Sequence, residues 1–312
     1  MKILVTGALG HIGSYLIRNL CAYLGNISEI RMLDNLSTQR YVSLFDLGDV
    51  TKYTFFEKDV ANENIEEYIK DIDYVINLAA KTDAASSFDH PEELMKNNMS
   101  CLKNIAESCS KFSIPLIHIS STSVYGDQSD VVDESYTIDN LNPQSPYADS
   151  KIKEEEYLEK SKSLKFIIFR FGTIFGVAPG IRFHTAVNKF CYQAALSLPI
   201  TVWETALNQK RPYLDINDAI RCIAFIIEKN NFNNKIYNVV TCNHTVSEIL
   251  HEIQMIIPEI EVNLVKHKIM NQLSYEVSSE LIQKLGFKFI GSLKDQIPNT
   301  LKLFKNINNP QK

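Results

Sequence analysis

Two residues four positions apart, Tyr147 and Lys151 in Ser-Pro-Tyr-Ala-Asp-Ser-Lys, have the types and spacing of a proton-transfer pair. A free tyrosine has a pKa of about 10 and is a poor base at neutral pH. On a helix, Lys151 would lie one turn further on the same face, where its ammonium favours the phenolate. At ~4 Å and an effective dielectric of ~20, that attraction is worth roughly 4 kcal/mol, or up to about three pKa units. The spacing alone also fits a packed tyrosine beside a solvated lysine, so it needs a second motif.

The second motif lies at the start of the chain, which reads Thr-Gly-Ala-Leu-Gly-His-Ile-Gly over residues 6–13. It follows a short apolar run and precedes a helical pattern, although its glycine spacing differs by one residue from the commoner Gly-x-Gly-x-x-Gly. Absent side chains let a pyrophosphate approach the backbone, and a helix N-terminus offers unpaired N–H groups with about half a positive charge. The segment therefore predicts a dinucleotide site, with cofactor contacts from Gly7, Gly10, His11, Ile12 and Gly13.

Asp34 ends the second predicted strand and is followed by Asn35. A carboxylate at this place accepts hydrogen bonds from the adenosine ribose and repels a 2′-phosphate. No arginine stands beside it in the sequence to receive that phosphate, so the pattern favours NAD over NADP. A bound NAD and the tyrosine–lysine pair together indicate redox chemistry on a hydroxyl or a ketone.

The elements that must position these residues alternate between short apolar strands and helices. Such alternation predicts an α/β fold, a Rossmann-like doubly wound parallel sheet. The predicted strands are 2–6, 29–33, 53–57, 73–78, 116–120, 166–169 and 236–240, and the predicted helices start at Ile12 and Pro91 or span 147–162, 186–196 and 246–257. Glycines after Arg170 indicate loops, and 230–234 indicates a surface loop. We expect an NAD-binding domain at 1–170, with a returning segment near 213–240, and a smaller α/β substrate-binding domain at 171–312.

Size and composition bound the remaining choices. The chain has 312 residues and a net charge of −5. A nucleic-acid-binding protein usually carries an excess of Lys and Arg, so this composition does not indicate a nucleic-acid partner. Its six cysteines are scattered without metal-ligand spacing, so we expect reduced, mostly buried thiols and no metal. No apolar run approaches the ~20 residues that span a bilayer. We therefore expect a cytoplasmic protein with no membrane partner.

Residues 117–126 read Ile-His-Ile-Ser-Ser-Thr-Ser-Val-Tyr-Gly, a predicted strand that ends in hydroxyls. With the motifs above, the chain resembles the extended short-chain dehydrogenases/reductases, and within them the NAD-dependent nucleotide-sugar epimerase/dehydratase family. The resemblance runs nearly the whole length, and the segments that carry it are Thr6–Gly13, Asp34, Asp59-Val60, Asn77–Ala80, Asn98, Ser120–Gly126, Tyr147 and Lys151, Arg170–Gly176 and Arg211–Asp218.

The resemblance implies a role for each matching residue. Ser121 would hold the reacting oxygen, Tyr147 would be the base, and Lys151 would bind the nicotinamide ribose and tune the tyrosine. Further cofactor contacts would come from Asn35, Asp59, Val60, Leu78, Ala79, Ala80 and Asn98. Arg211 would clamp the diphosphate of a nucleotide sugar, and further substrate candidates are Lys81, Thr82, Thr122, Thr173, Arg182 and Asn188. A homodimer is also implied, paired through the helices near 92–110 and 147–162, although burial against the sheet explains their apolar stripe (Leu94, Met99, Leu102, Cys109) equally well.

Departures from the family pattern narrow the reaction. Dehydratases of this family carry Asp-Glu where this chain has Thr122 and Ser123, so 4,6-dehydration is disfavoured. Many UDP-sugar epimerases have asparagine at the position of Thr173, which puts UDP in doubt.

We therefore predict NAD-dependent oxidation at C4 of a nucleotide-activated sugar to the 4-keto sugar. The sequence as a whole is similar to GDP-heptose 4-dehydrogenases of bacterial capsule pathways, which favours a GDP-sugar and a place in cell-surface polysaccharide synthesis. If the hydride returns to the sugar, the enzyme is instead a 4-epimerase on a UDP- or GDP-sugar. A catalytically silent NAD-sensing protein is disfavoured by the intact Ser121, Tyr147 and Lys151. An NADP reductase of small ketones conflicts with Asp34 and Arg211.

Overall fold

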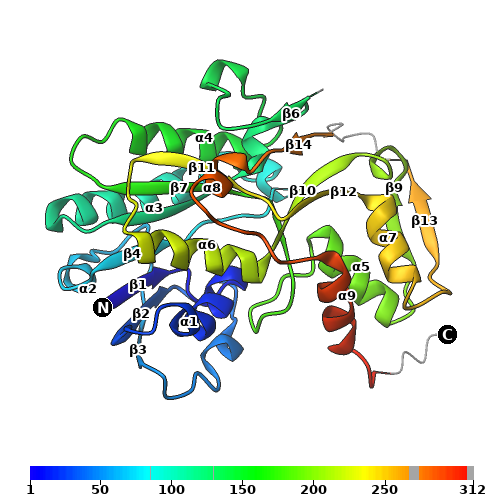
Figure 1. Ribbon diagram of the computed structural model, residues 1–312, viewed down its shortest axis with the longest axis horizontal. Helices are drawn as coiled ribbons and strands as arrows, with labels where there is room; N and C mark the ends of the chain where they lie inside the picture. The colour runs from blue at the N-terminus through cyan, green and yellow to red at the C-terminus, as the bar shows by residue number, and fades with distance from the viewer. Residues whose placement is uncertain (85, 129, 267–273, 308–312) are drawn as a thin grey trace.

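A seven-stranded parallel sheet forms the centre of the computed structural model, which describes residues 1–84, 86–128, 130–266 and 274–307 (Figure 1). The strand order is β11-β7-β5-β4-β1-β2-β3. The strands are β1 (Lys2–Thr6), β2 (Glu29–Asp34), β3 (Lys52–Glu57), β4 (Tyr74–Asn77), β5 (Leu116–Ser121), β7 (Phe166–Phe171) and β11 (Lys235–Val239). The order reverses between β1 and β4, which is the switch point where ligands bind in such sheets.

Helices cover both faces of this sheet, because its strands are apolar on both sides. Ile3 and Val5 point into one core with α1 (His11–Tyr23) and α6 (Ile216–Lys229). Leu4, between them, points into the opposite core with α3 (Pro91–Phe112). On that side α3 packs against α4 (Pro146–Glu159), and the short helix α2 (Glu66–Ile69) also contacts α3. The alternation of side chains along each strand therefore fixes both helical layers.

A second group of elements has its own core and lies on the right in Figure 1. It comprises a sheet of order β12-β10-β8, a pair β13-β9, and three helices. The elements are β8 (Thr173–Phe175), β9 (Ile200–Trp203), β10 (Lys210–Asp215), β12 (Cys242–Thr245), β13 (Val262–Val265), α5 (Ala186–Ala195), α7 (Val246–Gln254) and α9 (Leu293–Lys302). The remaining strands and α-helix of the described residues are the parallel pair β6 (Val131–Val132) and β14 (Glu276–Val277) and the helix α8 (Glu280–Lys284).

The predicted fold class is confirmed, and each of the seven predicted strands is present within two residues of its predicted ends. The region after Arg170 departs from the prediction, because β8 lies between Gly172 and Gly176, where loops were expected. A methyl group on Gly172 would lie 3.1 Å from the Pro212 carbonyl oxygen, so that glycine permits close packing against β10. The returning segment supplies α6 and β11 to the large sheet, while the two-domain division stays a prediction.

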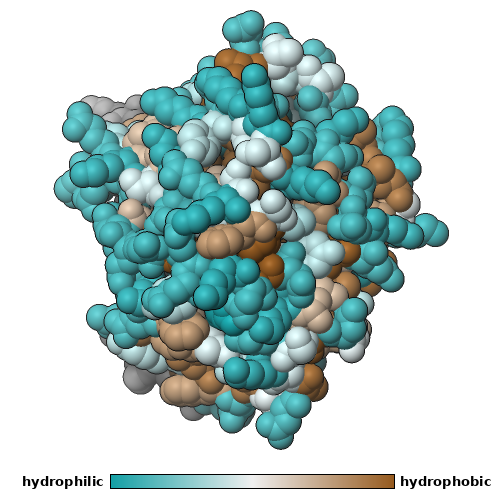
Figure 2. All heavy atoms as spheres, turned by 90° about the vertical axis from the view of Figure 1, so that its left-hand side faces the viewer, coloured by the Kyte–Doolittle hydropathy of each residue, from teal (hydrophilic) through white to brown (hydrophobic). Residues whose placement is uncertain are grey.

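Three of the four residues of the apolar stripe on α3, Leu94, Leu102 and Cys109, are buried within the protein, and Met99 is half-buried. Leu102 and Cys109 are fully buried and belong to the core between α3 and the sheet. The face at the left of Figure 1 is hydrophilic over most of its area, with apolar residues in small separate groups (Figure 2). Packing against the sheet thus accounts for Leu102 and Cys109 of the stripe, and the homodimer stays a prediction.

Candidate active site

The carboxyl ends of the central strands open onto one large cleft of about 1040 Å³. It gathers residues from the glycine turn, from the ends of β2, β4 and β5, from the start of α4, and from β8 and β10. The predicted site residues that line it are Gly7, Gly10, His11, Ile12, Gly13, Asp34, Asn35, Asp59, Val60, Leu78, Ala79, Ala80, Lys81, Thr82, Ser121, Thr122, Tyr147, Lys151, Thr173, Arg182 and Arg211.

The glycine turn forms one end of the cleft. Gly7 has a φ of +62°, and a methyl group there would lie 2.8 Å from the Leu78 carbonyl carbon. A methyl on Gly10 would approach only the Gly7 carbonyl oxygen, at 3.3 Å, because Gly10 otherwise faces the cleft. Among the described residues, no side chain caps the start of α1. The turn therefore leaves room and N–H groups for a phosphate, so these residues fit a dinucleotide.

The loop after β8 packs onto this turn. His11 Nε2 lies 2.8 Å from the Gly176 carbonyl oxygen, and the Gly180 N–H donates to Ser14 Oγ at 2.9 Å. Burial lowers the pKa of His11 to about 4, so at neutral pH the ring is uncharged and its Nε2–H donates to that carbonyl. The cofactor turn and the segment that leads to Arg182 are thus joined by direct hydrogen bonds.

Asp34 lies at the end of β2 with both oxygens already engaged. Oδ2 accepts the Leu9 N–H at 3.0 Å and Oδ1 accepts the Leu36 N–H at 2.9 Å. Each carboxylate oxygen has a second lone pair, so both can still accept a ribose hydroxyl. The structure also brings Arg40 into the cleft, six residues further along, where burial lowers its pKa and Asp34 opposes that change. Arg40 was not predicted as a site residue, because it stands six positions after Asp34 and only the fold brings the two together.

Tyr147 occupies the first turn of α4. The helix starts with Ser145 as its N-cap, whose Oγ accepts the Ala148 N–H, and with Pro146 as its first residue. One turn on, Lys151 places Nζ 5.9 Å from the centre of the Tyr147 ring. Ser121, at the end of β5, is within hydrogen-bonding reach of the phenol. The three predicted catalytic residues thus meet at one point of the cleft.

The acidity of Tyr147 differs from the expectation. Burial raises the pKa of the phenol above its ordinary value, and Lys151 and Arg182 only partly oppose that. Glu154, which the sequence analysis missed, acts in the same direction as burial. The lysine by itself therefore does not give an acidic tyrosine, because burial disfavours the phenolate and a carboxylate stands beside the ammonium.

The substrate candidates lie on the walls beyond Tyr147. Arg182 contacts the Thr82 hydroxyl, and burial together with Arg40 lowers the pKa of Arg182 to about 10. Thr122 donates to the Phe171 carbonyl oxygen at 3.3 Å. Arg211, Tyr275 and His184 line the cleft as well, and the last two are residues that the sequence analysis missed.

Asn98 and Asn188 lie behind the lining of the cleft. The Asn98 side chain accepts the Lys81 N–H at 2.8 Å and donates to the Lys81 carbonyl at 3.0 Å. The Asn188 side chain accepts the Gly176 N–H at 3.3 Å and donates to the Arg182 carbonyl at 3.0 Å. Both amides are buried and bonded to backbone groups, so each supports a wall of the cleft, and their contact with a ligand stays a prediction.

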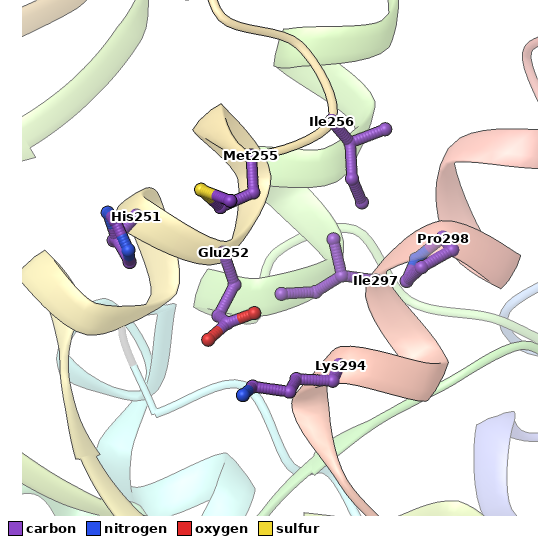
Figure 3. A pocket seen from close by; sticks show the side chains of 7 residues that line it. All are labelled: His251, Glu252, Met255, Ile256, Lys294, Ile297 and Pro298. Carbon is purple, nitrogen blue, oxygen red and sulfur yellow. The ribbon is translucent and has the colours of Figure 1, made fainter.

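A smaller hollow of about 370 Å³ lies between α7 and α9 (Figure 3). His251 and Glu252 enter it from α7, and Lys294, Ile297 and Pro298 from α9. None of the predicted site residues lines it. Among the described residues, no group of three or more His, Cys, Asp or Glu could hold a metal ion. The large cleft is therefore the candidate active site.

Comparison with known proteins agrees with this geometry. Residues 3–239 match the NAD dependent epimerase/dehydratase family. The chain belongs to this family. It is therefore an NAD-dependent enzyme, and the glycine turn, Asp34 and Tyr147 lie in the part that matches.

Two curated relatives illustrate the range of the family. An uncharacterized UDP-glucose epimerase of Bacillus subtilis is 26% identical over 257 residues, which cover 77% of this chain and 76% of the relative. A dTDP-D-glucose 4,6-dehydratase of Dictyostelium discoideum is 30% identical over 259 residues, which cover 77% of this chain but only 58% of that protein. This chain therefore spans little more than half the length of the second relative.

Solved structures show the same fold. A UDP-glucose 4-epimerase of Thermus thermophilus, in complex with NAD, aligns with a TM-score of 0.82 at 24% identity, over 98% of this chain and 99% of that one. A UDP-glucuronic acid 4-epimerase of Bacillus cereus aligns with a TM-score of 0.85 at 24% identity, again over 98% of this chain and 99% of that one.

Within the described residues, no helix has the length and apolar character needed to cross a membrane.

Proposed function

We propose that the enzyme oxidises C4 of a nucleotide-activated sugar, with Tyr147 as the base. The meeting of Tyr147, Ser121 and Lys151 in a cleft that begins at the glycine turn carries this proposal. Tyr147 takes the proton of the C4 hydroxyl, while Ser121 shares the hydrogen bonds of that oxygen. NAD, when bound, accepts the hydride from C4. Lys151 keeps its proton and orients the ribose, since its pKa is raised by Glu154 against the effect of burial.

The cationic side chains of the cleft support a diphosphate-bearing substrate. Arg211 is largely buried, and burial lowers its pKa, so an anion that pairs with it recovers the cost of desolvation. Arg182 lies near Tyr147 and acts on the phenol, so it stands close to the reacting part of the sugar. We assign Arg211 to the diphosphate and Arg182 to the sugar side of the cleft.

The fate of the 4-keto sugar separates two candidate functions. The names of several relatives and neighbours favour a 4-epimerase, in which the hydride returns to the opposite face of the sugar. Thr173 lines the cleft where many UDP-sugar epimerases have asparagine, which argues against UDP and leaves room for a GDP-sugar such as the GDP-heptose of the 4-dehydrogenases. We propose 4-epimerisation first and GDP-heptose 4-dehydrogenation second, in either case in a cytoplasmic homodimer that makes precursors of cell-surface polysaccharide.

The deciding experiment incubates the purified protein and NAD with UDP-glucose, UDP-glucuronic acid and a GDP-heptose. A product of unchanged mass and altered C4 configuration supports the epimerase. Stoichiometric NADH with a product lighter by two hydrogen atoms supports the dehydrogenase. The Tyr147→Phe variant is the control. If it converts a sugar as fast as the native enzyme, Tyr147 is not the base, and if neither protein acts on a sugar the proposal fails.

A further inference from the structure

A buried carboxylate stands directly behind the lysine of the site. Lys151 Nζ donates to Glu154 Oε2 at 2.7 Å and to the Ile119 carbonyl oxygen at 3.0 Å. The side chains of Lys151 and Glu154 are 3% and 1% exposed, so water screens their interaction little. An ammonium has three N–H donors. Among the residues that the structure describes, two of these donors have partners, and the third remains for the cleft that Lys151 lines.

A histidine from β5 approaches the same carboxylate oxygen as Lys151. His118 Nε2 lies 2.9 Å from Glu154 Oε2, although the two atoms are not aligned for a hydrogen bond. The Asn77 amide nitrogen, which can only donate, lies 3.2 Å from His118 Nδ1. Asn77 Oδ1 in turn accepts the Thr6 hydroxyl at 2.7 Å. This chain of partners makes Nδ1 the acceptor, so a neutral His118 carries its proton on the nitrogen that faces Glu154.

The permanent charges among these groups cancel. Burial lowers the pKa of His118, and burial raises that of the Cys101 thiol, which faces the pair from α3, to about 12. Both groups are therefore uncharged near neutral pH, as is Ser150, whose hydroxyl lies 3.4 Å from Glu154 Oε1. The ammonium of Lys151 and the carboxylate of Glu154 remain as one positive and one negative charge. Both act on Tyr147, and so do Arg182 and Ser121.

We propose that Glu154 is a positioning residue that holds Lys151 and cancels its charge at Tyr147, so that the phenol stays protonated in the protein without oxidised NAD. The proposal rests on the roles given above to Tyr147 and Lys151. Its physical basis is that a carboxylate 2.7 Å from an ammonium removes most of the field that the ammonium alone would exert several ångströms away. The tyrosine–lysine pair would then be a weak base by itself, and Tyr147 would take a proton only in the assembled complex with the cofactor.

The test titrates Tyr147 directly through the ultraviolet absorbance of its phenolate, as the difference between each protein and its Tyr147→Phe partner. This readout needs no sugar and no turnover. Without NAD, the native chain should give a Tyr147 pKa at or above the ordinary value of about 10. Glu154→Gln should lower that pKa by roughly one to two units, as loss of one nearby charge in a poorly screened site predicts. Glu154→Asp keeps the charge and should lower it by less than half as much.

Matched controls come from the same helix. Glu155→Gln removes a buried carboxylate that pairs with Arg170, and Glu156→Gln removes a more exposed one that pairs with Lys160. Neither should move the Tyr147 titration. An unchanged titration in Glu154→Gln, or an equal shift in Glu155→Gln, would overturn the proposal. If Glu154→Gln does not fold, the native titration decides, because a Tyr147 pKa of about 7 without NAD means that Lys151 is not compensated. If Tyr147→Phe abolishes sugar conversion while these titrations fail, the proposed function stands and only this inference falls.

Discussion

Glu154 and Glu155 are neighbours on α4, both are buried, and both pair with a cation, yet their surroundings differ. Glu155 accepts three hydrogen bonds from Arg170 of β7, one to Oε1 at 3.0 Å and two to Oε2 at 3.2 and 2.6 Å, and it also accepts the Ser120 hydroxyl. Arg170 then donates to the Tyr125 hydroxyl at 2.9 Å. That cluster has all its main donors and acceptors inside the protein. Lys151, beside Glu154, keeps one donor for the cleft.

The difference separates a structural ion pair from a functional one. A buried charge whose partners are all supplied by the fold stabilises one packing of a helix on a strand. A buried charge with one open position, next to a cavity, is ready for a ligand. Two adjacent glutamates of one helix therefore contact different surroundings, because successive side chains of a helix point about 100° apart.

The largest effect should come from the cleft side of this comparison. Tyr147→Phe removes the proton acceptor, so turnover should fall by roughly 10²- to 10⁴-fold. The rate of NADH formation or of sugar conversion measures the loss, and an unchanged melting temperature shows that the fold is intact. A loss of less than about tenfold would mean that another group or water takes the proton.

A change in the Glu155–Arg170 pair should instead lower the stability of the fold. Glu155→Gln leaves the buried Arg170 guanidinium without its carboxylate, which should lower the free energy of unfolding by about 3 kcal/mol. Urea unfolding measures this loss, and the folded fraction should keep its specific activity. Equal losses of activity and stability would contradict the division between the two glutamates.

Acid should act on the cleft pair through linkage. Burial tends to raise the pKa of Glu154, but Lys151 and His118 outweigh it and lower the pKa below the ordinary value. The unfolded chain therefore binds the proton more tightly, so this stabilisation is full above the ordinary glutamate pKa of about 4.3 and is lost as the pH falls through the lower folded value. In Glu154→Gln, the slope of stability against pH below about 4 should be smaller by up to about 1.4 kcal/mol per pH unit. Parallel slopes in the two proteins would contradict the pair.

The smallest effect concerns a cation on the cofactor side of the cleft. Arg40→Gln should weaken NAD binding by about fivefold, or ~1 kcal/mol, because the half-buried guanidinium contributes to a partly hydrated charge contact. Calorimetric titration with NAD measures the change. Lys284→Gln, which changes an exposed side chain of α8, serves as the control and should bind NAD as the native chain does. An unchanged affinity in Arg40→Gln would place this arginine outside the cofactor contact.

Local patterns predicted most of the large sheet and the centre of the site. Each central strand is a short apolar run between turns, and the glycine turn and the Tyr147–Lys151 pair lie within single segments. The missed strand β10 contains Pro212, which is unfavourable in most strands but is accommodated here beside Gly172. The segment that contains Glu154 reads Lys-Ile-Lys-Glu-Glu-Glu, which in sequence is indistinguishable from a solvated helix face. Its burial depends on His118, a partner thirty-six residues away.

The hydrogen bonds between the glycine turn and the loop after β8 constrain how this enzyme could be redesigned. His11 and Ser14 bind that loop, and a methyl group on Gly180 would collide with the backbone of Leu9 and Gly10. Residues 176–180 therefore affect both the glycine turn, where the cofactor is expected, and the segment that carries the substrate candidate Arg182. Arg182 itself lies just after these contacts. Along this loop, changes that alter sugar preference should be sought from position 182 onward, because changes at residues 176–180 would also disturb the glycine turn.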